Sequence, residues 1–268
     1  MKIINNFWKY TFTLIFIFLV SFLYFQMKAS EDSLFDNTTI IEPSEEEELV
    51  LEIEAPRHPV PEIISNVNEK PDLIALPQLN ESDEYLHLTL SGFLDDKFSS
   101  LIVKTRLIEK IVATIDNLPR EYMNERMRPI GFKVSTFEVE SQENLNGFIL
   151  STKNYVRYEV LVNGLSKIDI NLLADTYLRF YPLLQEAYED LGYPGSYFND
   201  RVIEVIDHLI DTPEINDPII VHRPYILYEF AHPDIEALSS GQKLLLRLGA
   251  RNSSRVKQFL KEFRALIS

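Results

Sequence analysis

The residues best suited to binding lie in the stretch LGYPGSYFNDR, residues 191–201. Two tyrosines, an asparagine, an aspartate and an arginine are close together there: Tyr193, Tyr197, Asn199, Asp200 and Arg201. Tyrosine and arginine are enriched among the residues that dominate the binding energy of protein interfaces. We therefore treat these five residues as a candidate binding surface, with the two tyrosines and the arginine at its centre.

The same stretch also has a purely structural explanation. Gly192 is placed to end a helix with a positive φ, and Pro194-Gly195 suits the central positions of a type II turn. Ser196 or Asn199 could cap the helix that follows. Because these residue types meet local backbone needs, the sequence leaves open whether the stretch is a site or only a turn.

The sequence contains no pattern typical of catalysis or metal binding. It has no cysteine, no G-x-S-x-G motif and no glycine-rich phosphate loop. None of its histidines falls in a metal-ligand spacing such as H-E-x-x-H: His58, His87, His208, His222 and His232. His208 with Asp207 and Asp211 could touch a cation, but an exposed helix face explains them better. We predict no enzymatic activity, no cofactor and no metal site.

Aromatic and acidic side chains keep a second hypothesis open. A small ligand or a cell-wall glycan could bind, or be hydrolysed, at a site framed by Tyr155, Tyr158, Tyr177, Tyr181, Tyr188, Tyr197 and Asp200. Tyrosines on helices more often pack, with the hydroxyl group at the domain edge.

A basic surface is predicted on the last two helices. It comprises Lys243, Arg247, Arg251, Arg255, Lys257, Lys261 and Arg264, and Glu262 is the only acid after residue 240. This surface could bind an anionic partner or the chain's own Glu45–Glu48, or it could simply balance the acidic rest of the domain.

These residues belong to a domain predicted over residues 80–268, mostly α-helical with one small β-hairpin. The hairpin is expected within residues 130–150, where apolar residues alternate and Asn146-Gly147 offers a tight turn. Elsewhere apolar residues recur at helical spacing. Helices are expected behind a Ser82 cap and within residues 99–121, ending near Pro119.

Helices are also expected over residues 154–168 and after the 191–201 stretch, where apolar residues recur at helical spacing: Val202, Val205, Ile206, Leu209 and Ile210. Three more helices are expected in the C-terminal half. The first, residues 170–192, should be kinked or split by Pro182. The last two should meet at Gly249, with Asn252 or Ser253 capping the second.

The start of the chain predicts a membrane anchor, residues 1–30. Residues 10–27 carry no charge, which gives a helix of about 27 Å, and the span flanked by aromatic rings covers residues 7–27. A cleaved signal peptide is the alternative, but no A-x-A pattern follows the apolar stretch. Lys2 and Lys9 precede the helix and Lys28 follows it, so the N-terminus is expected in the cytoplasm and the domain in the periplasm.

A tether is predicted between the anchor and the domain, over residues 31–79. It has six prolines and 13 acidic against 2 basic side chains, so we expect it to be disordered and extended. It supplies most of the net charge of −15. An acidic chain with its domain outside the cytoplasm does not suit nucleic-acid binding, and no nucleic-acid partner is predicted.

Several motifs together resemble a known family. They are IDNLPR (115–120), RPIGF (128–132), NYVRY (154–158), RFYPLLQEAYEDLGYP (179–194), YFNDRVIEVIDHLIDTP (197–213) and LSSGQKLLLRLG (238–249). In this order they resemble the bacterial family catalogued as domain of unknown function 3014, over roughly residues 75–265. The resemblance implies an N-terminal membrane helix, a linker and this domain, and it assigns no catalytic residue.

The sequence therefore predicts a single-pass protein of the bacterial inner membrane. Its periplasmic domain is expected to be a non-enzymatic interaction module that meets another envelope protein.

Overall fold

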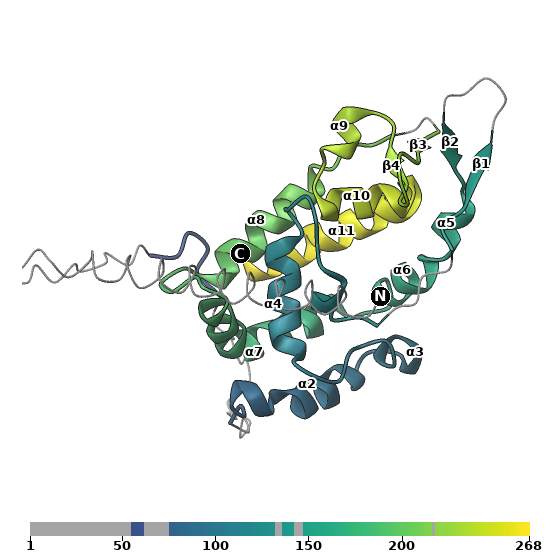
Figure 1. Cartoon of the computed structure of the whole chain (residues 1–268). Helices are drawn as coiled ribbons and strands as arrows, with labels where there is room; N and C mark the ends of the chain where they lie inside the picture. Colours follow the sequence, from purple (N-terminus) through teal and green to yellow (C-terminus); the bar gives the residue numbers. More distant parts are fainter. Residues whose placement is uncertain (1–54, 62–74, 132–135, 142–146, 216–217) are drawn as a thin grey trace, which may run out of the picture. The chain divides into compact units, whose positions relative to one another are not determined.

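The computed structural model describes residues 55–61, 75–131, 136–141, 147–215 and 218–268 (Figure 1). All of them belong to one compact unit, Ile53–Ser268. The predicted anchor lies outside the described residues. Within the ranges given, no helix has both the length and the apolar character needed to cross a bilayer.

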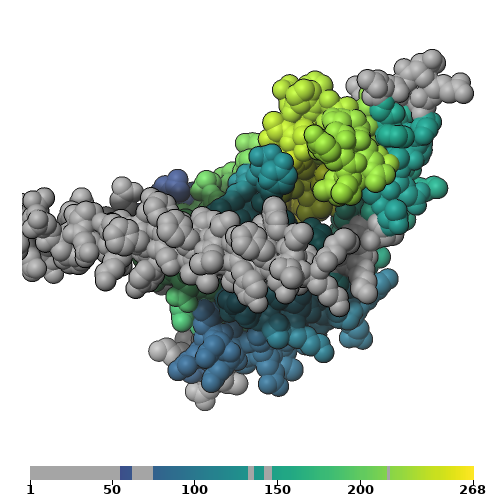
Figure 2. Space-filling view, viewed as in Figure 1, coloured from purple at the N-terminus to yellow at the C-terminus, as the bar shows by residue number. Residues whose placement is uncertain are grey.

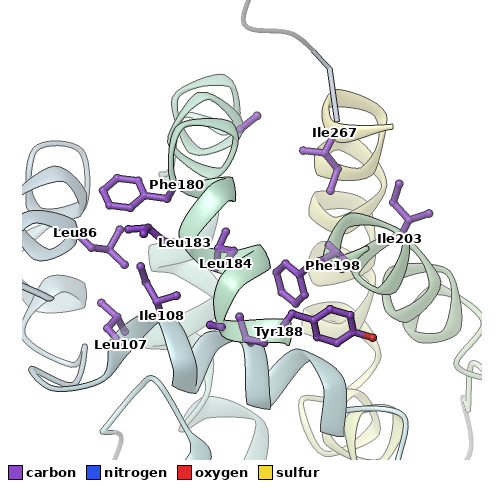
Figure 3. Close-up of a cluster of buried hydrophobic side chains, with 14 of the residues drawn as sticks. Leu86, Leu107, Ile108, Phe180, Leu183, Leu184, Tyr188, Phe198, Ile203 and Ile267 are labelled. Carbon is purple, nitrogen blue, oxygen red and sulfur yellow. The ribbon is translucent and has the colours of Figure 1, made fainter. Parts of the chain in front are cut away.

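The longer helices of the described ranges enclose the main core. They are α2 (Ser82–Ser91), α4 (Leu107–Asn117), α7 (Ile170–Asp190), α8 (Phe198–Ile210) and α11 (Ala250–Ile267). Figure 3 shows Ile108 of α4 and Leu184 of α7 pointing into this core, with Phe198 of α8 nearby. Ile108 and Phe198 are fully buried. The mainly helical fold is confirmed.

Shorter helices connect and extend this bundle. They are η1 (Leu79–Glu81), α3 (Asp96–Ser99), η2 (Glu125–Met127), α5 (Lys153–Val156), α6 (Glu159–Leu165), α9 (Pro233–Glu236) and α10 (Ser240–Arg247). Val162 of α6, Val205 of α8 and Leu245 of α10 share a smaller buried cluster, which fixes these helices against one another.

The predicted hairpin is confirmed but is part of a larger sheet. β1 (Val139–Ser141) pairs antiparallel with β2 (Phe148–Leu150), as expected from the sequence. β3 (Ile220–His222) and β4 (Glu229–Phe230) add to it, in the order β1-β2-β3-β4. The prediction of a single hairpin is thus corrected, because β2 pairs with a strand about 70 residues later in the chain.

The sheet has a core of its own. Leu150, Val221 and Phe230 are buried on it and pack with Leu246 of α10. Tyr228 lies between this core and the surface, in ring contact with Phe137 and Phe148.

α4 begins later than the apolar periodicity predicts. Ile102 instead forms a β-bridge with Ile130, so the chain is not helical there. Asp83 of α2 then accepts the backbone N–H groups of Arg106 and Leu107, at 2.7 and 2.8 Å, and caps the start of α4. The end of α4 before Pro119 agrees with the prediction.

Pro182 does not split α7. The helix runs uninterrupted from Ile170 to Asp190 with the proline inside it. A proline costs a helix about 3 kcal/mol, and burial of an apolar side chain returns roughly 1.5–3 kcal/mol. Phe180, Leu183 and Leu184 are all buried beside Pro182, and their burial accounts for the continuous helix.

Gly249 separates α10 from α11, as predicted, with φ at 79°. The predicted cap of α11 is wrong, because the helix already begins at Ala250. Asn252 therefore lies inside the first turn, where its Nδ2 donates to the Leu248 carbonyl at 3.1 Å.

Parts of the predicted tether are ordered on the domain. Leu76 and Leu79 pack against the main core, so the domain begins before residue 80. Residues 55–61 are also described, and they contact α8. The proline and acid content of residues 31–79 predicted disorder. Apolar packing of Leu76 and Leu79 and backbone hydrogen bonds of Arg57 and His58 hold these two stretches on the domain.

Candidate functional site

The turn between α7 and α8 carries the predicted binding residues. Gly192 adopts φ of 114°, a conformation that favours glycine. Neither Ser196 nor Asn199 caps α8 with its side chain. Gln185 of α7 takes that role, since its Oε1 accepts the Phe198 N–H at 2.8 Å and its Nε2 donates to the Ser196 carbonyl at 2.8 Å. The turn is thus fixed from α7.

Asp116, near the end of α4, is the centre of a buried ion-pair network. Arg201 of α8 donates from Nε to Asp116 Oδ1 at 3.0 Å and from Nη2 to the Asp116 carbonyl at 2.8 Å. Arg120 Nη2 and the Tyr193 hydroxyl donate to Asp116 Oδ2, at 2.7 and 3.2 Å. The Asp116 side chain is 3% exposed, so its charge depends on these partners. The network joins α4, the turn and α8.

The remaining contacts of Tyr193 and Arg201 are also internal. The Tyr193 ring stacks on Tyr188 at 4.7 Å between centroids. Arg201, 19% exposed, also pairs with Glu204 at 3.1 Å. These two residues were predicted to face a partner, and the structure uses both to hold helices together.

Asn199 and Asp200 bind the segment Ala55–Pro61, which we call the strap. Asp200 Oδ1 accepts the His58 N–H at 2.7 Å, and Oδ2 accepts the Arg57 N–H at 3.0 Å. Asn199 Nδ2 donates to the His58 carbonyl at 2.9 Å. In Figure 1 the strap is the blue-violet segment near the end of α11. Its docking was not predicted.

Tyr197 completes the predicted set, half buried at the N-cap position of α8. Two of the five residues contact Asp116, and two others contact the strap. The predicted residues are neighbours in space, but they do not form one exposed surface.

The tyrosines of the alternative site are mostly packing residues. The Tyr177 hydroxyl donates to Asn199 Oδ1 at 2.8 Å, and the Tyr181 hydroxyl donates to Gln185 Oε1 at 3.1 Å. Burial raises the pKa of Tyr177, Tyr181 and Tyr188 above the usual tyrosine value. A raised pKa disfavours these hydroxyls as bases at neutral pH.

A family model described as "Protein of unknown function (DUF3014)" matches residues 107–264. The chain belongs to this family. No curated protein and no solved structure matches it significantly. Three motifs that carried the resemblance meet at the ion-pair network, since they contribute Asp116 and Arg120, Tyr193, and Arg201. The DUF3014 motifs that form this network thus position helices.

The predicted basic surface of the DUF3014 domain is partly buried. Lys243 pairs with Glu236 at 2.9 Å, and its side chain is 5% exposed. Lys257 is buried and donates to the Thr212 carbonyl. Burial lowers the pKa of Arg247, whose guanidinium lies 5.3 Å from the Phe230 ring centroid.

The other basic side chains are divided between internal pairs and solvent. Arg255 donates to Asn163 Oδ1 at 3.0 Å, and Arg264 holds both carboxylate oxygens of Asp207, at 2.7 and 3.0 Å. Arg251 and Lys261 are exposed. The seven predicted basic residues therefore do not share one exposed surface, because the side chains of Lys243, Arg247 and Lys257 pack into the domain.

The histidines take part in ordinary hydrogen bonds. His87 Nε2 lies 2.7 Å from the Val103 carbonyl, and His208 Nε2 lies 2.9 Å from Ser239 Oγ. In the described ranges, no group of three or more acidic or histidine side chains is arranged to hold a metal ion.

An open groove of about 510 Å³ runs along α11 of the DUF3014 domain. Its lining combines charged, polar and apolar side chains, among them Ser166, Ile170, Arg255, Phe259 and Glu262. None of the tyrosines proposed for a ligand site lines it.

The loop between β3 and β4 exposes three consecutive apolar side chains. Tyr225, Ile226 and Leu227 are 86, 79 and 76% exposed. The yellow-green segment that contains them reaches the surface in Figure 2. The sequence reasoning missed this feature, although PYIL between two short apolar runs was its signal. Contiguous exposed apolar residues often mark an interaction site, whereas single ones are common on any protein surface.

Proposed function

We propose that this chain is a membrane-anchored, non-enzymatic interaction module whose periplasmic domain binds another envelope protein through the β3–β4 loop. The observation that carries this proposal is the run of three exposed apolar residues, Tyr225–Leu227. Complete burial of an isoleucine or leucine is worth about 1.5–3 kcal/mol. A partner that covers the loop would gain several kcal/mol from these side chains alone.

The loop is held in place for such a contact. Arg223 Nε donates to the Ile226 carbonyl at 3.0 Å, and its guanidinium lies 5.5 Å from the Tyr228 ring centroid. Tyr228 in turn packs against the core of the sheet. A loop ordered before binding loses less conformational entropy when its partner arrives.

Charge near the loop favours a protein partner over a lipid surface. β4 and α9 carry Glu229, Asp234 and Glu236, and residues 80–268 contain 28 acidic and 21 basic side chains. Anionic lipids attract basic segments, and acidic ones are repelled. An apolar recess on another protein suits the loop better.

Anchoring and location rest on the start of the chain. The uncharged residues 10–27 support a single membrane helix, and the acidic residues after it support a tether. The distribution of Lys2, Lys9 and Lys28 supports a cytoplasmic N-terminus in the inner membrane.

Photo-crosslinking in living cells tests the proposal. A photoreactive residue replaces Ile226 in the full-length protein, and Leu88 of α2, 66% exposed, is the matched control position. We expect a discrete protein adduct at position 226 and none at position 88. No adduct, or the same adduct at both positions, would contradict the proposal. A lipid adduct at 226 alone would show that the loop meets the membrane.

The groove along α11 gives a second candidate function, small-ligand or glycan binding. Arg255 and Glu262 on one side and Phe259 between them offer charge and an aromatic face to a polar ligand. Thermal shift with muropeptides tests it, since a ligand stabilises the protein by RT ln(1 + [L]/Kd). A shift in the native protein that disappears in Arg255→Ala would support this function, and unchanged melting with every ligand would exclude it for that panel.

A further inference from the structure

The hydrogen bonds between the strap and α8 are made to the peptide backbone, and a long ion pair joins Arg57 Nε to Asp200 Oδ2 at 3.9 Å. The two oxygens of Asp200 accept two successive N–H groups, and the amide nitrogen of Asn199 donates to the carbonyl of the second residue. Asp200 is 9% exposed and Asn199 fully buried. Such a pair recognises the backbone of an extended segment.

Asn199 is held in position by the domain itself. Its Oδ1 accepts the Tyr177 hydroxyl at 2.8 Å, and its Nδ2 also donates to the Ile267 carbonyl of α11 at 2.9 Å. These contacts do not involve the strap. The recognition site is therefore built by α7, α8 and α11.

The strap has the form of an extended peptide ligand. Pro56, His58 and Val60 are partly buried, whereas Ala55, Arg57 and Pro59 are exposed. One face of the segment thus contacts the domain, as in a β-strand. Ala55, His58 and Val60 each precede a proline, which restricts them to extended conformations. This restriction lowers the entropy lost on docking.

We propose that the first turn of α8 and the end of α11 form a receptor for extended, proline-containing peptides, occupied in this chain by its own strap. The ligand class is a peptide that presents two successive backbone N–H groups and a following proline. The strap competes with any external peptide because its covalent attachment gives it a high effective concentration. A partner that displaces it would release residues 55–61 from α8.

Peptide binding to the full-length protein in detergent tests the receptor. In one variant a seven-residue glycine-serine sequence replaces Ala55–Pro61, and a fluorescent peptide of residues 54–62 is titrated by anisotropy. We expect binding at least tenfold tighter than to the native chain. Asp200→Asn, which exchanges an acceptor oxygen for a donor nitrogen, should weaken it at least tenfold in that variant. Asp211→Asn, an exposed change at the C-cap of the same helix, should not.

Trypsin provides an independent test of the strap in the unmodified receptor. Within residues 31–79 the bond after Arg57 is the only one expected to be cleaved, because Lys70 precedes a proline. Val60→Ser removes an inward side chain and should accelerate this cleavage at least tenfold, whereas the outward Ala55→Ser should not. Equal cleavage in both variants, or peptide binding that Asp200→Asn leaves unchanged, would overturn the proposal.

Discussion

Removal of the Asp116 carboxylate should destabilise the domain more than any surface change. In Asp116→Ala, Arg201 loses its Nε partner at 3.0 Å, and Tyr193 loses an acceptor. Breaking a buried ion pair by removing one partner costs about 3–5 kcal/mol, because the other charge is left without compensation. For a domain of this size, 1 kcal/mol corresponds to about 2–4 °C in Tm. We expect Tm to fall by about 6–20 °C.

A double-mutant cycle separates the ion pair from other effects of the substitution. Arg201→Ala alone should cost about as much as Asp116→Ala, since it leaves the carboxylate with Arg120 and Tyr193 only. The double variant should cost well below the sum, with a coupling energy of about 2 kcal/mol or more. Urea unfolding of residues 53–268, the compact unit, provides the free energies.

Arg120→Ala is the matched control. Arg120 also pairs with Asp116, but its side chain is 53% exposed. Solvent screens such a pair, so its loss should cost about 1 kcal/mol or less. Two results would contradict this reasoning. In the first, Asp116→Ala lowers the free energy of unfolding by no more than Arg120→Ala does. In the second, the loss in the double variant equals the sum of the losses in Asp116→Ala and Arg201→Ala.

Three further predictions concern single positions. Burial raises the pKa of Tyr177, so the stabilisation from its neutral form is complete below about pH 10 and is lost as pH rises through the raised folded value. The tyrosinate absorbance of Tyr177, measured as the difference between the native protein and Tyr177→Phe, should appear only on alkaline unfolding. Gly249→Ala places a Cβ 2.7 Å from a tyrosine ring at φ 79°, and calorimetry should show at least twice the loss of Gly192→Ala, which has open space. Ser239→Ala removes the capping box of α10 and should cost about 1 kcal/mol in urea unfolding.

Local sequence signals predicted much of the helical fold. Apolar spacing located α7, α8 and α11, and Gly249 marked the boundary between the last two helices. Pro119 correctly marked the end of α4. These features depend on residues within a few positions of one another, which a single sequence contains.

Features set by distant contacts could not be predicted in the same way. β3 and β4 have three and two residues, too short for a periodic signal, and β3 is defined by pairing with a strand about 70 residues earlier. The start of α4 depends on Asp83 from another helix. Contacts between residues that are far apart in the sequence override the local preference for a helix or a strand.

Distant contacts also determine where the residues of the candidate site lie. Tyr193 and Arg201 are residue types typical of binding surfaces. In the structure both donate hydrogen bonds to Asp116, about 80 residues earlier in the chain. The sequence likewise placed Asp207 on an exposed helix face, and in the structure this residue pairs with Arg264 of α11. Residue types alone do not distinguish a partner outside the chain from one inside it.

The receptor and its occupant come from different parts of the chain. Asn199 and Asp200 lie inside the range that matches the DUF3014 family, and the strap lies before it. The hydrogen bonds are made to backbone groups, which any extended segment of suitable conformation can provide. The folded domain therefore supplies the receptor, and the predicted tether supplies the segment that occupies it. A competing peptide needs the strap's backbone pattern, and it must bind tightly enough to compete with the high effective concentration of the attached strap.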